Sequence, residues 1–304
     1  MTSPGTPGRL RRAWTTLASA LGRRARPLTV VNIVMQGAII VSGGVVRLSG
    51  SGLGCTQAPH CEVGHVTPSL EQISHHTVIE YGNRTFSALV VAVAALTAVA
   101  VWHTRKDLKW LGLVPVAGAV AQAIIGIVTV YAHLNASVVA VHMLVSTTLV
   151  WASVYLALAY RNAPRREGAP LRWWLRLQTA LTAVVVVLGS LVTGSGPHSG
   201  DEAVTARLGF ELEAITRVHA LSVWAFVALL AYLVWRVRAD RSVGPRNEVR
   251  RAWVVLAVVT LAQGAIGYTQ YFTGLPAVVV AMHLGGAGAL VAAQAATAYL
   301  LREA

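Results

Sequence analysis

Three histidines stand inside long apolar stretches of the sequence. His142 belongs to ASVVAVHM, His219 to ELEAITRVHALSV and His283 to PAVVVAMHL. Because an ionisable side chain in an apolar segment is costly to bury, each one is a candidate functional residue, and imidazole is a good axial ligand for haem iron. The competing interpretation is a neutral histidine that is hydrogen-bonded across a helix interface.

A carboxylate accompanies them in the segment IEYGNR, residues 79–84. Glu80 and Asn83 are three residues apart and therefore share one face of a helix. Near an iron with an open coordination position, a carboxylate could move protons or orient water. The alternative is that Glu80 only forms an ion pair with Arg84, four residues further along the helix.

The elements that position these residues are predicted to be membrane helices. Of the 304 residues, 55% are hydrophobic and 12% are charged, and the mean hydropathy is +0.59. This composition lies outside the range of soluble globular domains, and a helix needs about 20 apolar residues to cross a bilayer. We therefore expect an all-α membrane protein with eight spanning helices, near residues 28–48, 79–102, 110–131, 137–160, 173–194, 212–235, 252–272 and 277–301.

The basic residues predict how these helices are oriented. If the N-terminus is cytoplasmic, all but four of the 25 Lys and Arg residues fall at cytoplasmic helix ends, which agrees with the positive-inside rule. Both termini are then cytoplasmic. The net charge of +13 is explained by this topology, with some attraction to anionic lipid, so no nucleic-acid partner is expected.

The chain also contains an internal repeat. AQAIIGIVTVYAHLNASVVAVH aligns with AQGAIGYTQYFTGLPAVVVAMH at ten of 22 positions, which sets His142 opposite His283. Four helices per half is an even number, so the halves run in the same direction as parallel repeats. The expected organisation is a basic N-terminal segment, a four-helix bundle with a long outer loop at 49–78, a cytoplasmic linker and a second four-helix bundle: 1–27, 28–160, 161–172 and 173–301.

This topology puts all three histidines in the outer leaflet, His142 and His283 roughly 8 Å below the starts of their helices at 1.5 Å per residue. His219 and His283 can then face each other and hold one haem between two imidazoles. When the start of the second helix is laid on that of the sixth, Asn83 falls opposite His219. The N-terminal half is therefore expected to offer one histidine and to leave a coordination position of the iron open.

Four arginines remain on the outer side, Arg47, Arg84, Arg207 and Arg217. Haem propionates are paired carboxylates, and the guanidinium fork matches them. Arg47 and Arg84 are thus candidates for binding one haem, and Arg217 for binding the other. Snorkelling of arginine toward the membrane interface would explain the same positions.

The segment GGVVRLSGSGLGCTQAPHC (43–61), followed by IEYGNR and by two membrane histidines at repeat-related positions, resembles haem A synthase. The resemblance covers nearly all of the chain from about residue 28 to residue 301. It implies a multi-pass enzyme of the bacterial plasma membrane that oxidises the C8 methyl group of haem O by successive hydroxylations. The product, haem A, is used for terminal oxidase assembly.

The resemblance also implies roles for individual residues. His219 and His283 would bind a haem b cofactor, whereas His142 and Glu80 would serve the substrate haem. The best-known members have a histidine in the second helix where this chain has Asn83. The departure agrees with an open position on the substrate iron, because a carboxamide is a poor axial ligand.

Two cysteines, Cys55 and Cys61, lie in the first outer loop. Their spacing fits neither a zinc knuckle nor the attachment motif of c-type haem, and the outer compartment permits disulfides. The resemblance supports a Cys55–Cys61 disulfide that shapes the loop over the substrate site. A redox-active pair, and a copper site that includes His60, are the alternatives.

Two other classes of protein fit parts of the pattern. A di-haem b-type electron-transfer protein of the quinol-linked cytochrome kind would need two histidine pairs, whereas a transporter could use polar helix residues such as Gln36, Gln122 and Gln263. The expected partners are haem O, the lipid bilayer, an electron donor and haem O synthase. The sequence leaves open the identity of the donor and whether the chain forms a homo-oligomer.

Overall fold

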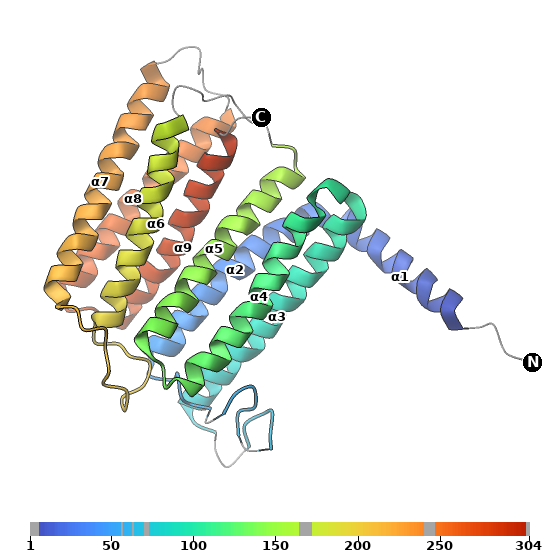
Figure 1. The fold of residues 1–304 in the computed structure, drawn as a ribbon, viewed down its shortest axis with the longest axis horizontal. Coiled ribbons are helices and arrows are strands. Elements are labelled where there is room, and N and C mark those ends of the chain that lie inside the picture. Colours follow the sequence, from blue (N-terminus) through green and yellow to red (C-terminus); the bar gives the residue numbers. More distant parts are fainter. Residues whose placement is uncertain are drawn as a thin grey trace, which may run out of the picture.

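The computed structural model describes residues 6–55, 57–62, 64–69, 73–163, 172–239 and 247–301. Within these ranges the regular structure is helical (Figure 1). The elements in chain order are α1 (Thr6–Arg23), α2 (Ala25–Leu48), α3 (His75–Thr104), the short 3-10 helix η1 (Lys106–Leu108), α4 (Lys109–Tyr131), α5 (Ala136–Tyr160), α6 (Arg172–Ser195), α7 (Leu212–Ala239), α8 (Asn247–Phe272) and α9 (Ala277–Leu300).

Helices α2 to α9 are long and apolar enough to cross a membrane. The eight predicted spans are therefore confirmed, and the chain is a multi-pass membrane protein. The predicted starts and ends differ from the observed ones by a few residues, because polar residues such as His75 and Asn247 extend the helices beyond their apolar parts. Most of the predicted linker 161–172, and basic residues such as Arg241 and Arg302, lie outside the described residues.

Helix α1 was not predicted. It lies in the basic N-terminal segment and extends away from the bundle (Figure 1). Its charged residues lower its hydropathy too far for a membrane span, yet Trp14 and Leu17 are exposed apolar side chains and Ala18 is buried. A helix with basic and apolar faces of this kind suits the membrane interface.

The helices form two groups, α2 to α5 and α6 to α9 (Figure 1). Helices α2 and α5 both contact α9, and α5 also contacts α6, so these four helices join the groups. In the first group, α3 packs along both α2 and α4. In the second group, α7 packs along α6 and α8 packs along α9, but α7 meets α8 only over a short stretch.

The main hydrophobic core occupies one end of the second group. It combines residues late in α5, α7 and α9 with residues early in α6 and α8, and Phe226, Leu233 and Tyr299 are among its most buried members. His219 and His283 lie near the N-terminal ends of α7 and α9, away from this cluster, and do not belong to it. The main apolar core therefore fills one end of the bundle, and the histidines lie at the other end.

Candidate functional site

The three candidate histidines lie at similar depths in their helices. His142 and His283 each come six residues after the first residue of α5 and α9, Ala136 and Ala277. His219 comes seven residues after the start of α7. All three side chains are partly buried, which agrees with the shared level that the sequence predicted.

Each imidazole ring packs against a glycine of a neighbouring helix. A Cβ placed on Gly189 of α6 would lie 3.2 Å from Cε1 of His219. In the described part of the chain, Nδ1 of His142 and Nδ1 of His283 are buried and accept or donate no hydrogen bond. For these two residues, the structure therefore does not support the competing interpretation of a histidine hydrogen-bonded through Nδ1 across an interface.

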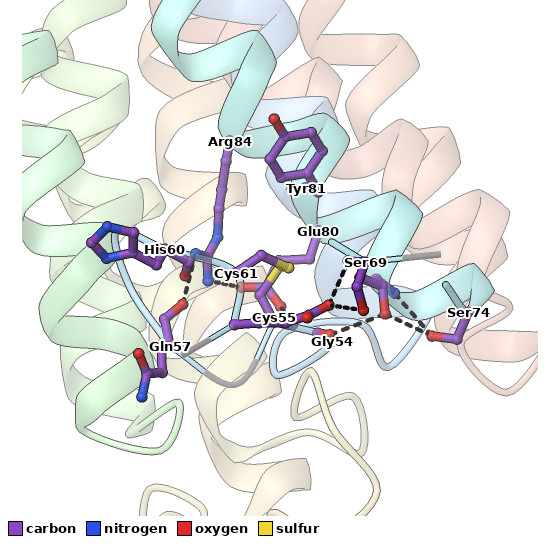
Figure 2. The surroundings of a disulfide bond; sticks show 12 residues. Gly54, Cys55, Gln57, His60, Cys61, Ser69, Ser74, Glu80, Tyr81 and Arg84 are labelled. Atoms are coloured by element: carbon purple, nitrogen blue, oxygen red, sulfur yellow. Dashed lines mark hydrogen bonds and ion pairs between the residues drawn. A yellow bond between two sulfur atoms is a disulfide. The ribbon is translucent and has the colours of Figure 1, made fainter. Parts of the chain in front are cut away.

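Glu80 lies in the second turn of α3 and is only 4% exposed. The main-chain N–H of Cys55 donates to its Oε2 at 2.7 Å, and Nη2 of Arg84 donates to its Oε1 at 2.5 Å (Figure 2). The ion pair with Arg84 that the sequence offered as an alternative is thus present. It is one of two contacts that fix the carboxylate, since the loop between α2 and α3 supplies the other.

The loop between α2 and α3 contains the predicted disulfide between Cys55 and Cys61, which is confirmed. Gly54, directly before this ring, packs so closely on the start of α3 that a Cβ would lie 2.5 Å from the carbonyl oxygen of His76. Only glycine permits this approach, which explains the last glycine of the motif SGLG. The two sulfurs are bonded to each other, so a copper site with His60 would have no thiolate ligands.

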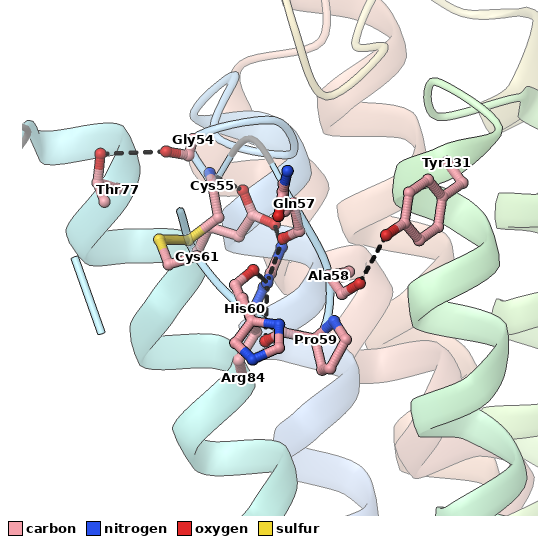
Figure 3. A network of polar contacts seen from close by, with 11 residues as sticks. Gly54, Cys55, Gln57, Ala58, Pro59, His60, Cys61, Thr77, Arg84 and Tyr131 are labelled. Atoms are coloured by element: carbon pink, nitrogen blue, oxygen red, sulfur yellow. Dashed lines mark hydrogen bonds and ion pairs between the residues drawn. A yellow bond between two sulfur atoms is a disulfide. The ribbon is translucent and has the colours of Figure 1, made fainter. Parts of the chain in front are cut away.

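Polar side chains of α3 and α4 hold the ring of residues closed by the disulfide. Nη1 of Arg84 donates to the carbonyl oxygens of Gln57 at 2.7 Å and of His60 at 2.8 Å. From the end of α4, the hydroxyl of Tyr131 donates to the carbonyl oxygen of Ala58 at 2.9 Å (Figure 3). The ring therefore lies over Glu80 in a fixed position.

The other predicted residues lie in separate surroundings. Asn83 Oδ1 accepts a hydrogen bond of 2.8 Å from the hydroxyl of Ser42 on α2. Arg217 pairs with Glu213 at the exposed start of α7. The structure therefore brings Glu80 and Arg84 together with both cysteines, and binding of a haem carboxylate by Arg84 or Arg217 stays a prediction.

Arg47 reaches from α2 into the second group of helices. Its Nε donates to the carbonyl oxygen of His198 at 2.7 Å, and its Nη2 donates to that of Thr193 at 2.6 Å. These carbonyls belong to the end of α6 and the loop that follows it. Two of the nitrogens of Arg47 thus join the halves, and its predicted contact with a haem propionate also stays a prediction.

Some residues around the site were not singled out by the sequence reasoning. Ser42 and Tyr131 carry no local signal, because their partners are 41 and 73 residues away in the chain. Among the described residues, no group of three or more His, Cys, Asp or Glu side chains could hold a metal ion by itself. Binding of haem iron by single imidazoles stays a prediction.

Known proteins resemble this chain over most of its length. A family model described as COX15-CtaA, cytochrome oxidase assembly protein, matches residues 26–199. A protein named heme A synthase from Lysinibacillus sphaericus is 26% identical over 267 residues, which cover 81% of this chain and 84% of that protein. Proteins of the same name from Bacillus pumilus and Listeria monocytogenes are 24% identical over 275 and 277 residues, covering 82% and 84% of this chain and 86% and 88% of their own lengths.

The family match runs from α2 to the end of α6 and includes the disulfide-closed ring and Glu80. It covers more than half of the chain, and the three relatives extend the similarity further into the second group of helices. The chain therefore belongs to the COX15-CtaA family of cytochrome oxidase assembly proteins.

Proposed function

We propose that the two halves of this haem A synthase, which converts haem O to haem A, hold two haems with different roles. In the C-terminal half, His219 and His283 would hold haem b, which would supply electron transfer. His142 holds the substrate haem in the N-terminal half, where Glu80 handles protons. The observation that carries the proposal is the buried, doubly fixed carboxylate of Glu80 beneath the disulfide-closed ring.

The halves are proposed to be parallel repeats with both termini in the cytoplasm. The contact between α2 and α9 has its counterpart in the contact between α6 and α5, as expected for two similar bundles related by an axis that passes between α5 and α9. The start of α2, the basic α3–α4 turn and the end of α9 share one end of the molecule (Figure 1). The positive-inside rule assigns that end to the cytoplasm.

Two observations support haem b between His219 and His283. The apolar core does not extend to this end of the bundle. Gly189 leaves the ring of His219 the space that a side chain would fill. The residues present therefore fit a flat group held between two imidazoles.

Glu80 is proposed to accept, hold and return protons during the oxidation of the C8 methyl group to a formyl group. This conversion proceeds by two successive hydroxylations and loss of water, and bound haem supplies the redox chemistry. The N–H of Cys55 and the guanidinium of Arg84 fix the direction in which the carboxylate points. A carboxylate held this way can act on a bound substrate or a water molecule with little loss of orientation entropy.

Asn83 is proposed to leave the position opposite His142 open. Its carboxamide oxygen already accepts a hydrogen bond from the hydroxyl of Ser42, and a carboxamide is a weak axial ligand compared with imidazole. The N-terminal half then offers one strong ligand where the C-terminal half offers two. An open position suits a haem that reacts, whereas a closed pair suits a haem that relays electrons.

The test is a reduced-minus-oxidised visible spectrum of the detergent-purified protein, followed by extraction of the bound haems and their identification by chromatography and mass. We expect haem b together with haem O, its hydroxylated intermediate or haem A. Haem b alone, with no conversion of added haem O, would favour a di-haem electron-transfer protein. Absence of any haem would overturn the histidine assignments.

A further inference from the structure

The repeated sequence AQxxxG is at residues 121–126 on α4 and at residues 262–267 on α8. In both copies the glutamine contacts the candidate histidine of the next helix. Nε2 of Gln122 donates to the main-chain carbonyl oxygen of His142 at 2.9 Å. Nε2 of Gln263 donates to that of His283 at 3.0 Å.

The glycine of each copy faces the ring of the same histidine. A Cβ on Gly267 would lie 3.3 Å from Cε1 of His283 and 3.8 Å from its Nδ1. A Cβ on Gly126 would lie 3.7 Å from Cε1 of His142. Glutamine and glycine are four residues apart and share a helix face. In each half, the glutamine thus hydrogen-bonds the main chain of the histidine, and the glycine one turn later packs against its ring.

Residues around Gln263, the glutamine in the C-terminal half, leave space for this contact. Gly286 of α9 has no side chain where a Cβ would overlap Oε1 of Gln263. In the N-terminal half, Gln122 also hydrogen-bonds the hydroxyl of Ser146, which itself donates to the carbonyl of His142 at 3.0 Å. Gln263 therefore has space beside Gly286, and Gln122 has a hydrogen-bond partner in Ser146. Each arrangement allows the amide to lie against the helical turn that carries the histidine.

His219 on α7 has no such glutamine among the described residues. Its carbonyl oxygen accepts a hydrogen bond of 2.6 Å from Ser222 of its own helix, and its ring packs on Gly189 of α6. Asn83, which has the corresponding position on α3 in the repeat, accepts a hydrogen bond from Ser42. The two halves thus fix the histidine on α5 and the histidine on α9 in the same way. They differ at the repeat-related position on α3 and α7, which is Asn83 in one half and His219 in the other.

We infer that Gln122 with Gly126, and Gln263 with Gly267, are positioning residues that fix one haem ligand in each half, His142 and His283. The opposite position, Asn83 or His219, then decides whether the bound iron is open or closed. This inference rests on the proposed function. A residue that orients a metal-ligating histidine from outside the ligand set is commonly worth about 10-fold to 100-fold in metal affinity or activity.

The experiment measures haem b in purified full-length variants by its low-spin electron paramagnetic resonance signal and by its rate of transfer to apomyoglobin. Gln263→Met keeps the side-chain length and removes the N–H donors. We expect about 10-fold faster loss of haem b and a shifted low-spin signal. Gln122→Met should leave haem b unchanged and speed the loss of bound haem O instead.

Gln294→Met is the matched control, because Gln294 is a fully buried glutamine on α9 about 16 Å from His283 along the helix axis. It should leave signal and transfer rate as in the unaltered protein. If Gln263→Met does not purify, Gly267→Ala tests the same contact from the ring side and should shift the low-spin signal.

The inference would be overturned if Gln263→Met, or Gly267→Ala where that variant is used, kept the low-spin signal and the haem b transfer rate of the unaltered protein. Failure of the proposed function has a different signature. In that case the unaltered protein contains no haem b, or His283→Ala retains it with the same low-spin signal. The two results are read from the same spectra and cannot be confused.

Discussion

Each half of the molecule carries a Glu–Arg pair four residues apart near the start of a helix, and the two pairs have different surroundings. In Glu80–Arg84 on α3, the side chains are 5% and 21% exposed. In Glu213–Arg217 on α7, they are 55% and 73% exposed. The difference comes from the disulfide-closed ring, which covers the first pair and bonds to both of its members.

The same short-range pattern thus produces an exposed ion pair in one half and a buried, oriented carboxylate in the other. Exposed pairs contribute little to stability because water and salt screen them. A buried carboxylate that is held by two donors has a fixed direction, which proton transfer requires. We therefore expect substitution of Glu80 to affect the chemistry and substitution of Glu213 to have almost no effect.

The largest expected effect is that of Glu80→Gln. The amide keeps the size of the side chain but cannot take up a proton, so turnover of haem O should fall about 100-fold to 10,000-fold. The measurement is the ratio of haem A to haem O after a fixed time, with haem b content as the control for folding. Turnover close to that of the unaltered protein would show that proton transfer does not pass through Glu80.

Removing the disulfide in the double variant Cys55→Ser, Cys61→Ser should rank second. The N–H of Cys55 would no longer be held against Glu80, and a hydrogen bond to a charged group is worth about 1.5–3 kcal/mol. Turnover should therefore fall about 10-fold to 100-fold.

Tyr131→Phe provides a graded control for the disulfide variant. It removes the hydrogen bond to Ala58 but leaves the disulfide, so it should cost less turnover than the double variant, in line with the ~1 kcal/mol of an ordinary hydrogen bond. If the double variant turned over haem O as fast as Tyr131→Phe does, the ring would be irrelevant to the direction of Glu80.

Asn83→His would make the N-terminal half resemble the C-terminal half. A second imidazole should give the substrate haem a six-coordinate, low-spin spectrum. Turnover should fall about 10-fold, which corresponds to roughly 1.4 kcal/mol for displacing the added ligand. A six-coordinate spectrum with undiminished turnover would contradict the open position, and Ser42→Ala separates this effect from loss of the hydrogen bond between Ser42 and Asn83.

The smallest effect is expected for Glu213→Gln. The pair with Arg217 is exposed, so its loss should change the free energy of unfolding by less than about 1 kcal/mol, and turnover should change by less than about twofold. Haem b content and turnover of haem O are measured side by side with those of Glu80→Gln. A large loss of turnover would mean that the exposed pair also serves the reaction, which would remove the contrast between the halves.

Hydropathy and charge predicted the eight spans well, because a membrane helix is defined by its apolar length. They did not predict α1, because its basic residues lower the mean hydropathy of a segment that also has apolar residues. The pair Glu80–Arg84 followed from helix spacing, and the disulfide followed from a family resemblance. Contacts such as Ser42 with Asn83 join different helices, and one sequence without an aligned set of relatives carries no signal for such distant pairs.

Arg47 has a consequence for how the halves behave together. Its bonds to Thr193 and His198, and the bond of 2.7 Å from the N–H of Gly52 to the carbonyl oxygen of Gly200, form only when the outer segments of both halves are in place. Ordering of one segment therefore favours ordering of the other, and this linkage is reciprocal by thermodynamic necessity. We therefore expect the loops at this end of the protein to order as one cooperative unit.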